Sequence, residues 1–173
     1  KERKFRISPE SLFTDLETLL SEQFDFVINA IGVIRPTGTK EDMYDSFFVN
    51  SYFPQILSQF SDRYGTRLIH VSTDCVFTGK NGNYAERDIP DEYGIYGMSK
   101  FLGEITRSPH LTLRTSIIGR ELGTQKNLID WFLSNADGTS VNVYKNVFWN
   151  GVTTIVLAKI IERVIGKNLF SEG

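Results

Sequence analysis

The sequence has a single cysteine, Cys75, so its 173 residues cannot form a disulfide bond within the chain. Together with the lack of a signal-peptide pattern at the N-terminus, this favours a reducing, cytoplasmic compartment. Lysine and arginine (19) nearly balance aspartate and glutamate (21), and the two signs are interspersed, which disfavours nucleic acid as a partner. No apolar run approaches the roughly 18 residues of a membrane span, so no membrane partner is expected. The composition favours small molecules or other proteins as partners.

Helical and extended patterns alternate along the chain, which indicates an α/β protein with a doubly wound parallel sheet. A hydrophobic content of 40% is enough for a sizeable core. The first helix is predicted to start at Ser8-Pro9-Glu10, with Ser8 as its N-cap. The other predicted elements are strands at 26–31, 67–72 and 111–117, and helices at about 43–64, around Tyr96 and Lys100, and at about 153–165.

Tyr96 and Lys100 have the spacing of a proton-transfer pair. At positions i and i+4 of a helix their side chains share a face. A lysine cation beside a phenol favours phenolate, so we expect Lys100 to lower the pKa of Tyr96 towards neutral. Thr73 lies 23 residues before Tyr96, where a buried strand ends. Open parallel sheets bind their ligands at that edge, so a hydroxyl there can contact a substrate oxygen.

Three segments around this pair resemble the extended short-chain dehydrogenase/reductase family, whose dinucleotide-binding fold is Rossmann-like. They are Val71-Ser72-Thr73-Asp74-Cys75-Val76-Phe77-Thr78-Gly79, Tyr84-Ala85-Glu86 and Tyr93-Gly94-Ile95-Tyr96-Gly97-Met98-Ser99-Lys100. Further matches are Asp25-Phe26-Val27-Ile28-Asn29-Ala30, Val49-Asn50 and Leu113-Arg114-Thr115-Ser116. The resemblance covers roughly residues 7–165, and its nearest branch is that of the dTDP-4-dehydrorhamnose reductases.

The resemblance implies NAD(P)H-dependent reduction of a 4-keto nucleotide sugar in deoxysugar or polysaccharide biosynthesis. Tyr96 would be the general acid that protonates the substrate oxygen, and Lys100 would also hydrogen-bond the nicotinamide ribose. Thr73 would orient the substrate carbonyl, and Asp74 would complete the catalytic set. The resemblance implies NAD or NADP as cofactor and a nucleotide sugar as substrate, and it leaves a homodimer open. Neither histidine is accompanied by other residues of metal-ligand type, so no metal is assigned.

The resemblance also assigns binding residues along the predicted sheet edge. The predicted cofactor contacts are Ala30, Ile31, Gly32, Asn50, Ser72, Tyr96, Lys100, Thr115 and Ser116, and the predicted substrate contacts are Thr73, Asp74, Val76, Phe77 and Trp149. The asparagines Asn29 and Asn50 are expected mainly to hold loops, and Ser72 to make a supporting backbone bond. For Arg114 two roles stay open, a contact near the nicotinamide end of the cofactor and a salt bridge. The aromatic residues Trp131, Phe132, Phe148 and Trp149 are expected more often in a core than in a pocket.

Cys75 bears on the reaction class. Dehydratases of the family carry an Asp-Glu pair after the threonine, whereas here Asp74 is followed by Cys75. A cysteine thiol is a poor proton donor to a leaving hydroxyl group, so the residue favours reduction over dehydration. Two alternatives stay open. One is a non-catalytic regulatory subunit with the same fold, similar to the beta subunit of methionine adenosyltransferase, and the other is a nucleotide-sugar epimerase.

The sequence also lacks a glycine-rich turn of the Gly-x-x-Gly-x-x-Gly kind, which holds the pyrophosphate in this family. Gly32, Gly38 and Gly65 do not form that pattern. We therefore expect the chain to lack the first β-α-β unit of the fold and to be part of a longer protein. Residues 1–120 are predicted to be a partial dinucleotide-binding domain with the catalytic residues, and residues 121–173 part of a small sugar-nucleotide lobe.

Overall fold

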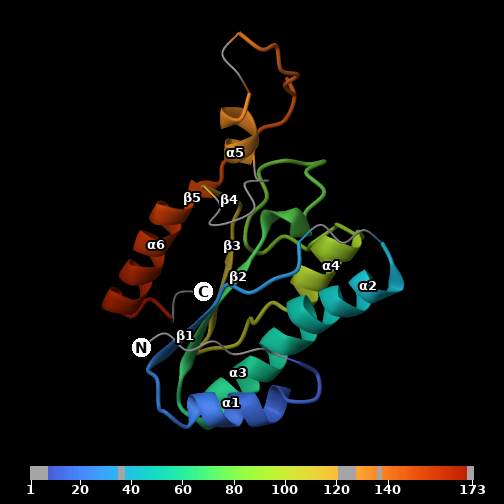
Figure 1. Cartoon of the computed structure of the whole chain (residues 1–173). Helices are drawn as coiled ribbons and strands as arrows, with labels where there is room; N and C mark the ends of the chain where they lie inside the picture. Colours follow the sequence, from blue (N-terminus) through green and yellow to red (C-terminus); the bar gives the residue numbers. More distant parts are fainter. Residues whose placement is uncertain (1–7, 35–37, 121–127, 136–137, 171–173) are drawn as a thin grey trace. The chain divides into compact units, whose positions relative to one another are not determined.

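Two compact units make up the chain in this computed structural model, which describes residues 8–34, 38–120, 128–135 and 138–170 (Figure 1). The first unit contains the described residues up to Arg114 together with Phe170. The second unit spans Thr115–Leu169. The predicted boundary after residue 120 therefore lies a few residues inside the second unit.

A parallel three-stranded sheet forms the centre of the first unit. Its order is β1 (Phe26–Asn29), β2 (Arg67–Ser72) and β3 (Leu111–Arg114). The register pairs Asn29 with His70 and Ser72 with Arg114. All three strands therefore end at the same edge of the sheet, where parallel sheets bind ligands.

Two helices cover one face of this sheet and form the core with it. They are α1 (Leu12–Leu20) and α3 (Phe53–Arg63), which lie together below the strands in Figure 1. Leu12, Leu16 and Leu20 recur every four residues on α1, so all three are buried on one side of the helix. The core cluster is completed by Phe53, Ile56, Leu57, Phe60, Leu68 and Ile105.

The start of α1 differs from the prediction. The helix begins at Leu12, and Ser11 rather than Ser8 is at its N-cap position. Residues 9–11 form a turn, in which the Ser8 side chain accepts a hydrogen bond from the Ser11 backbone N–H at 3.3 Å. The serine therefore caps this turn instead of the helix.

The helix predicted at about 43–64 is observed as three consecutive segments. These are α2 (Lys40–Phe47), a π-helical turn η1 (Phe48–Tyr52) and α3. α2 starts earlier than predicted because the Thr39 side chain accepts a hydrogen bond from the Asp42 backbone N–H at 3.1 Å and caps it. Pro54 has no backbone N–H to donate to the carbonyl of residue 50, so regular α-helical bonding is interrupted at η1.

The strand predicted at 111–117 is shorter than expected. β3 ends at Arg114, and Ile117–Ile118 form a separate strand, β4, which pairs in parallel with β5 (Val152–Thr153) in the second unit. The second unit also contains α5 (Leu128–Leu133) and α6 (Thr154–Lys167). Thr153 caps α6 by accepting a hydrogen bond from the Val156 backbone N–H, and the left-handed conformation of Asn168 (φ 55°) ends the helix.

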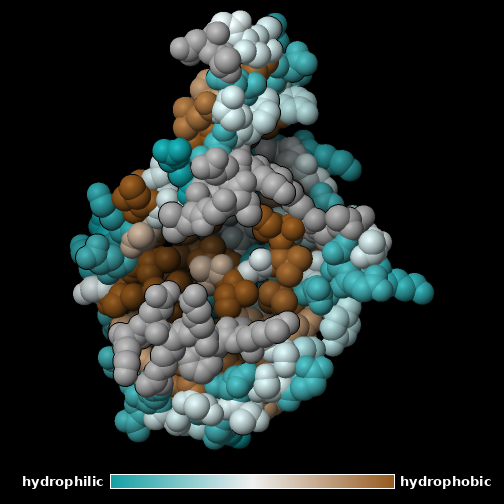
Figure 2. All heavy atoms as spheres, viewed as in Figure 1, coloured by the Kyte–Doolittle hydropathy of each residue, from teal (hydrophilic) through white to brown (hydrophobic). Residues whose placement is uncertain are grey.

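The second unit exposes the aromatic residues that were expected in a core. Phe132 is 60% exposed and Phe148 is 96% exposed, so that expectation is wrong for them. Trp131 and Trp149 are also exposed. Figure 2 shows apolar side chains, in brown, around α5.

The prediction of an α/β protein with a Rossmann-like parallel sheet is confirmed. Among the described residues, no helix is long and apolar enough to cross a membrane.

Candidate active site

Thr73 lies directly after β2 in extended backbone and is almost fully buried. Its hydroxyl oxygen accepts a hydrogen bond from the Cys75 backbone N–H at 3.1 Å and so caps the short helix η2 (Asp74–Val76). The hydroxyl donates to Asp74 Oδ1 at 3.3 Å. This local capping fixes the Thr73 side chain at the carboxyl end of the central strand.

Tyr96 and Lys100 both lie on α4 (Ile95–Leu102). Gly97, between them, allows α4 to approach η2, because a Cβ atom at Gly97 would lie only 2.4 Å from the carbonyl oxygen of Cys75. The close approach brings Tyr96 next to Thr73, whose hydroxyl acts on the pKa of the phenol. The structure therefore brings the predicted hydroxyl, phenol and ammonium groups together within the first unit.

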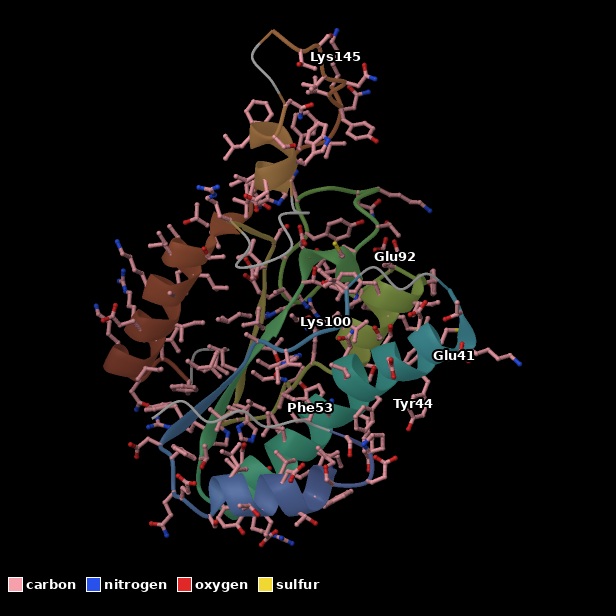
Figure 3. The ribbon with its side chains drawn as sticks, viewed as in Figure 1. Glu41, Tyr44, Phe53, Glu92, Lys100 and Lys145 are labelled. Atoms are coloured by element: carbon pink, nitrogen blue, oxygen red, sulfur yellow. The ribbon has the colours of Figure 1, made fainter. Side chains whose placement is uncertain are left out.

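Lys100 is 4% exposed and lies between α4 and β2 (Figure 3). Its Nζ donates a hydrogen bond to the backbone carbonyl of Val71 at 2.8 Å. Burial lowers its pKa from 10.5 to about 8, although the carboxylate of Glu104 acts in the opposite direction. The ammonium is therefore still the main form at neutral pH.

Tyr96 has a raised pKa, which corrects the expectation that Lys100 lowers it. Burial is the main cause, and the neighbouring Thr73 hydroxyl opposes it. The negative charges of Asp74 and ionised Cys75 raise the pKa further. The phenol is therefore protonated at neutral pH, as a general acid requires.

Asn50 clamps the chain after β1, as expected for a loop-holding residue. It is fully buried in η1, its Oδ1 accepts from the Val33 backbone N–H at 2.8 Å, and its Nδ2 donates to the Val33 carbonyl at 2.9 Å. Nδ2 also donates to Ser99 Oγ at 3.0 Å, which connects the loop to α4. A Cβ atom at Gly32 would lie 3.3 Å from Asn50 Oδ1 and 3.7 Å from Lys100 Nζ. Gly32 thus leaves its backbone open beside the ammonium.

Asn29 has the loop-holding role that was expected of it. Its Oδ1 accepts a hydrogen bond from the Ile31 backbone N–H at 3.1 Å, and its Nδ2 lies 3.0 Å from Nδ1 of the fully buried His70. Burial lowers the pKa of His70 to about 3, so the ring is neutral, and because the Asn29 amide nitrogen can only donate, Nδ1 is the acceptor of this bond. Ala30 and Ile31 follow with exposed side chains at the sheet edge.

Ser72 differs from its predicted role, because its hydroxyl donates to Glu104 Oε1 at 2.8 Å instead of to the backbone. Arg114 forms a salt bridge, one of the two roles predicted for it, with its Nη2 atom 2.7 Å from Glu104 Oε2. Glu104 itself was not predicted. It follows Lys100 by four residues, but nothing in the sequence pairs it with a residue ten positions later.

The side chains on and next to η2 that were predicted to contact the substrate differ in their exposure. Val76 is fully buried, and its predicted substrate contact stays a prediction. Phe77 is partly buried and stacks on Tyr84, with 4.3 Å between the ring centroids. Cys75 has exposed surface as a residue, but neighbouring atoms partly desolvate its thiol, and this desolvation raises the pKa of the thiol. A protonated thiol leaves Asp74 as the carboxylate at this strand end.

Thr115, Ser116 and Trp149 belong to the second unit. Trp149 Nε1 donates to Ser116 Oγ at 2.7 Å, and a Cβ atom at Gly151 would collide with the indole ring at 2.2 Å. The Thr115 hydroxyl donates to the Ser116 carbonyl at 3.2 Å. These contacts hold Trp149 against the chain around Ser116 while leaving it 49% exposed.

Among the residues that the structure describes, no group of three or more histidine, cysteine, aspartate or glutamate side chains is arranged to hold a metal ion.

Comparison with known proteins places the chain in a family. The family model described as the RmlD substrate binding domain matches residues 12–171. The chain belongs to this family. Among curated relatives, a dTDP-4-dehydrorhamnose reductase of Aggregatibacter actinomycetemcomitans is 32% identical over 149 residues, which are 80% of this chain and 50% of that protein. The chain thus spans about half the length of this curated relative.

A second kind of relative carries a different name. The methionine adenosyltransferase 2 subunit beta of Danio rerio is 50% identical over 40 residues, which are 23% of this chain and 12% of that protein. Among solved structures, a hypothetical dTDP-4-dehydrorhamnose reductase from Sulfolobus tokodaii matches with a TM-score of 0.80 at 24% identity. The match covers 96% of this chain and 61% of that one, and it supports the fold.

Proposed function

We propose that the full-length protein containing this chain is an NAD(P)H-dependent reductase of a 4-keto nucleotide sugar. The observation that carries the proposal is the convergence of Thr73, Tyr96 and Lys100 at the carboxyl end of the central strand. The name of the Aggregatibacter relative supports the same reaction class. Reduction of this kind would serve deoxysugar or polysaccharide biosynthesis in the cytoplasm.

The residues around Lys100 fit the nicotinamide end of a dinucleotide. Gly32 offers backbone without a side chain, and the ammonium of Lys100 lies within 3.7 Å of the space that a Cβ would fill there. Such a position suits a hydrogen bond from Lys100 to a ribose hydroxyl. A solved dTDP-4-dehydrorhamnose reductase from Bacillus anthracis is described in complex with NADP, and it matches this chain with a TM-score of 0.58 at 22% identity. When bound, the cofactor would supply the hydride.

The side chains would then handle the proton. Tyr96 is protonated at neutral pH and would donate its phenol proton to the carbonyl oxygen of the substrate. Thr73 lies next to Tyr96 at the same strand end, so its hydroxyl can also orient that oxygen. The ammonium of Lys100, one turn along α4, would stabilise the phenolate that remains.

Cys75 supports reduction over elimination of water. Its thiol pKa is raised, so at neutral pH it is neither an anionic base nor a strong acid. Dehydration would need a second acid or base beside Asp74, and Cys75 occupies the position at which dehydratases of the family carry a glutamate.

The test compares the full-length wild type with Tyr96→Phe in reduction of a 4-keto-6-deoxy nucleotide sugar. The substitution removes the hydroxyl group and leaves the ring, so we expect turnover to fall by about 10²–10⁴-fold with an unchanged melting temperature. Turnover of the variant within a few-fold of the wild type would refute the role of Tyr96.

The regulatory-subunit alternative rests on the similarity to methionine adenosyltransferase 2 subunit beta. A purely regulatory protein has no need for a buried ammonium beside a phenol and a threonine hydroxyl. Stimulation of a methionine adenosyltransferase by a wild-type protein that lacks reductase activity would favour this alternative.

A further inference from the structure

Glu104 lies directly behind the candidate active site, at the turn that follows α4. Its side chain is 3% exposed. Oε1 accepts from the Ser72 hydroxyl at 2.8 Å and from Arg114 Nε at 2.9 Å, and Oε2 accepts from Arg114 Nη2 at 2.7 Å. Both oxygens are therefore held by donors on other elements.

These bonds join the ends of two strands. Ser72 and Arg114 are register partners in β2 and β3, and Glu104 bonds to both of them. Thr73 follows Ser72 directly, so the carboxylate anchors the strand end from which the Thr73 hydroxyl projects. Charge-assisted bonds of this kind, buried from water, are stronger than neutral ones.

The backbone of Glu104 is fixed as firmly as its side chain. Gln55 Nε2 donates to the carbonyls of Leu102 and Glu104, each at 3.1 Å. A Cβ atom at Gly103 would lie 1.9 Å from the carbonyl oxygen of Asn50, so the turn is in direct contact with η1. These contacts hold the turn that carries Glu104 against η1 and α3.

Glu104 also lies close to Lys100, because the ammonium bonds to the Val71 carbonyl at 2.8 Å and the carboxylate bonds to the hydroxyl of the next residue, Ser72, at 2.8 Å. The hydrogen-bond acceptor of the ammonium, the Val71 carbonyl, is neutral. His70, whose pKa is about 3, is also neutral at physiological pH, and Tyr96 is protonated. The attraction of Glu104 for Lys100 opposes the burial that disfavours its charge.

We propose that Glu104 is a positioning residue of the reductase, which aligns the Thr73 strand end and supplies the negative charge that the buried Lys100 ammonium requires. The role in catalysis rests on the proposed function, whereas the effect on Lys100 can be measured without substrate. Arg114 and Ser72 are the groups through which Glu104 holds the strand ends.

The experiment uses the full-length protein and five variants. Competitive acetylation followed by mass spectrometry gives the titration midpoint of Lys100 without substrate, and the pH profile of kcat is measured in parallel. Glu104→Gln removes the carboxylate, and the double variant Glu104→Gln/Arg114→Met also removes the cation that would otherwise be left unpaired. Arg114→Met keeps the carboxylate. Glu17→Gln is the matched control, because Glu17 pairs with Arg63 at the surface at 2.9 Å.

We expect the Lys100 midpoint, which is about 8 in the wild type, to move to lower pH by about one unit in both variants that lack the carboxylate. The alkaline limb of kcat should move with it. Arg114→Met and Glu17→Gln should show no such fall. Glu104→Asp keeps a carboxylate, so its Lys100 midpoint should fall less than that of Glu104→Gln. A merely structural role would lower stability without this pattern.

An unchanged Lys100 midpoint in folded Glu104→Gln and in the double variant would overturn the proposal. If the midpoint moves as expected but the wild type reduces no keto sugar, the proposed function fails, and the catalytic role of Glu104 fails with it. A moved midpoint with an unmoved kcat profile would also refute that role, while leaving the reductase activity itself intact.

Discussion

Gly97→Ala tests whether close packing of α4 on η2 positions Tyr96. An added Cβ would lie 2.4 Å from the Cys75 carbonyl oxygen and 2.6 Å from Cγ of Glu92. Glu92 can rotate away, but the backbone carbonyl cannot. Since ordinary contacts begin near 3.4 Å, α4 and η2 must separate by about 1 Å. A displacement of that size at a reacting group costs about 10²-fold in rate.

The assay follows oxidation of NADPH by the full-length protein with a 4-keto nucleotide sugar, together with urea unfolding. We expect kcat to fall by about 10²-fold and the free energy of unfolding to fall by about 1–3 kcal/mol. Gly166→Ala is the matched control, because nothing lies within 4 Å of its added Cβ on α6. The control should keep full activity and gain up to about 1 kcal/mol in stability from helix propensity. A folded Gly97→Ala protein with wild-type kcat would refute the reasoning.

Three further predictions concern charge and reaction class. Lys100→Met should reduce kcat, weaken cofactor binding and remove the alkaline limb near pH 8; an unaltered profile would show that Lys100 is not in the site. The pKa of His70 is lowered to about 3 in the folded protein, so the unfolded state binds a proton first as the pH falls. The free energy of unfolding of the wild type should therefore fall by up to about 1.4 kcal/mol per pH unit below about pH 6.5. Urea unfolding of His70→Gln should show a smaller slope. Neither wild type nor Cys75→Ser should convert a nucleotide hexose to a 4-keto product, as judged by chromatography; dehydration that Cys75→Ser abolishes would make the thiol catalytic.

The spacing in the sequence was enough to predict where the main functional groups meet. Tyr96 and Lys100 lie one helical turn apart, and Thr73 ends a strand, so fold geometry alone brings them to one edge. Asn50 was predicted as a loop clamp and is one. These predictions succeeded because each depends on local periodicity or on the common edge of a parallel sheet.

The groups that were missed depend on tertiary contacts. Glu104 and Ser99 form their key bonds with residues that are distant in the sequence, and no spacing rule indicates those pairs. The expected lowering of the Tyr96 pKa was wrong because burial, which the sequence does not reveal, has the larger effect. The break at η1 depends on Pro54 and on the contact between Gly103 and Asn50, of which only the proline is visible in the sequence.

The central claim is a net reduction in which Tyr96 supplies the proton. The most direct measurement incubates the full-length protein with a 4-keto-6-deoxy nucleotide sugar and nicotinamide cofactor carrying deuterium at the transferred position, and locates the label in the product by NMR. We predict one deuterium on the carbon of the former ketone, with stoichiometric oxidation of the cofactor, and almost none with Tyr96→Phe. A product without deuterium, or an epimerised sugar with no net oxidation of the cofactor, would contradict the account.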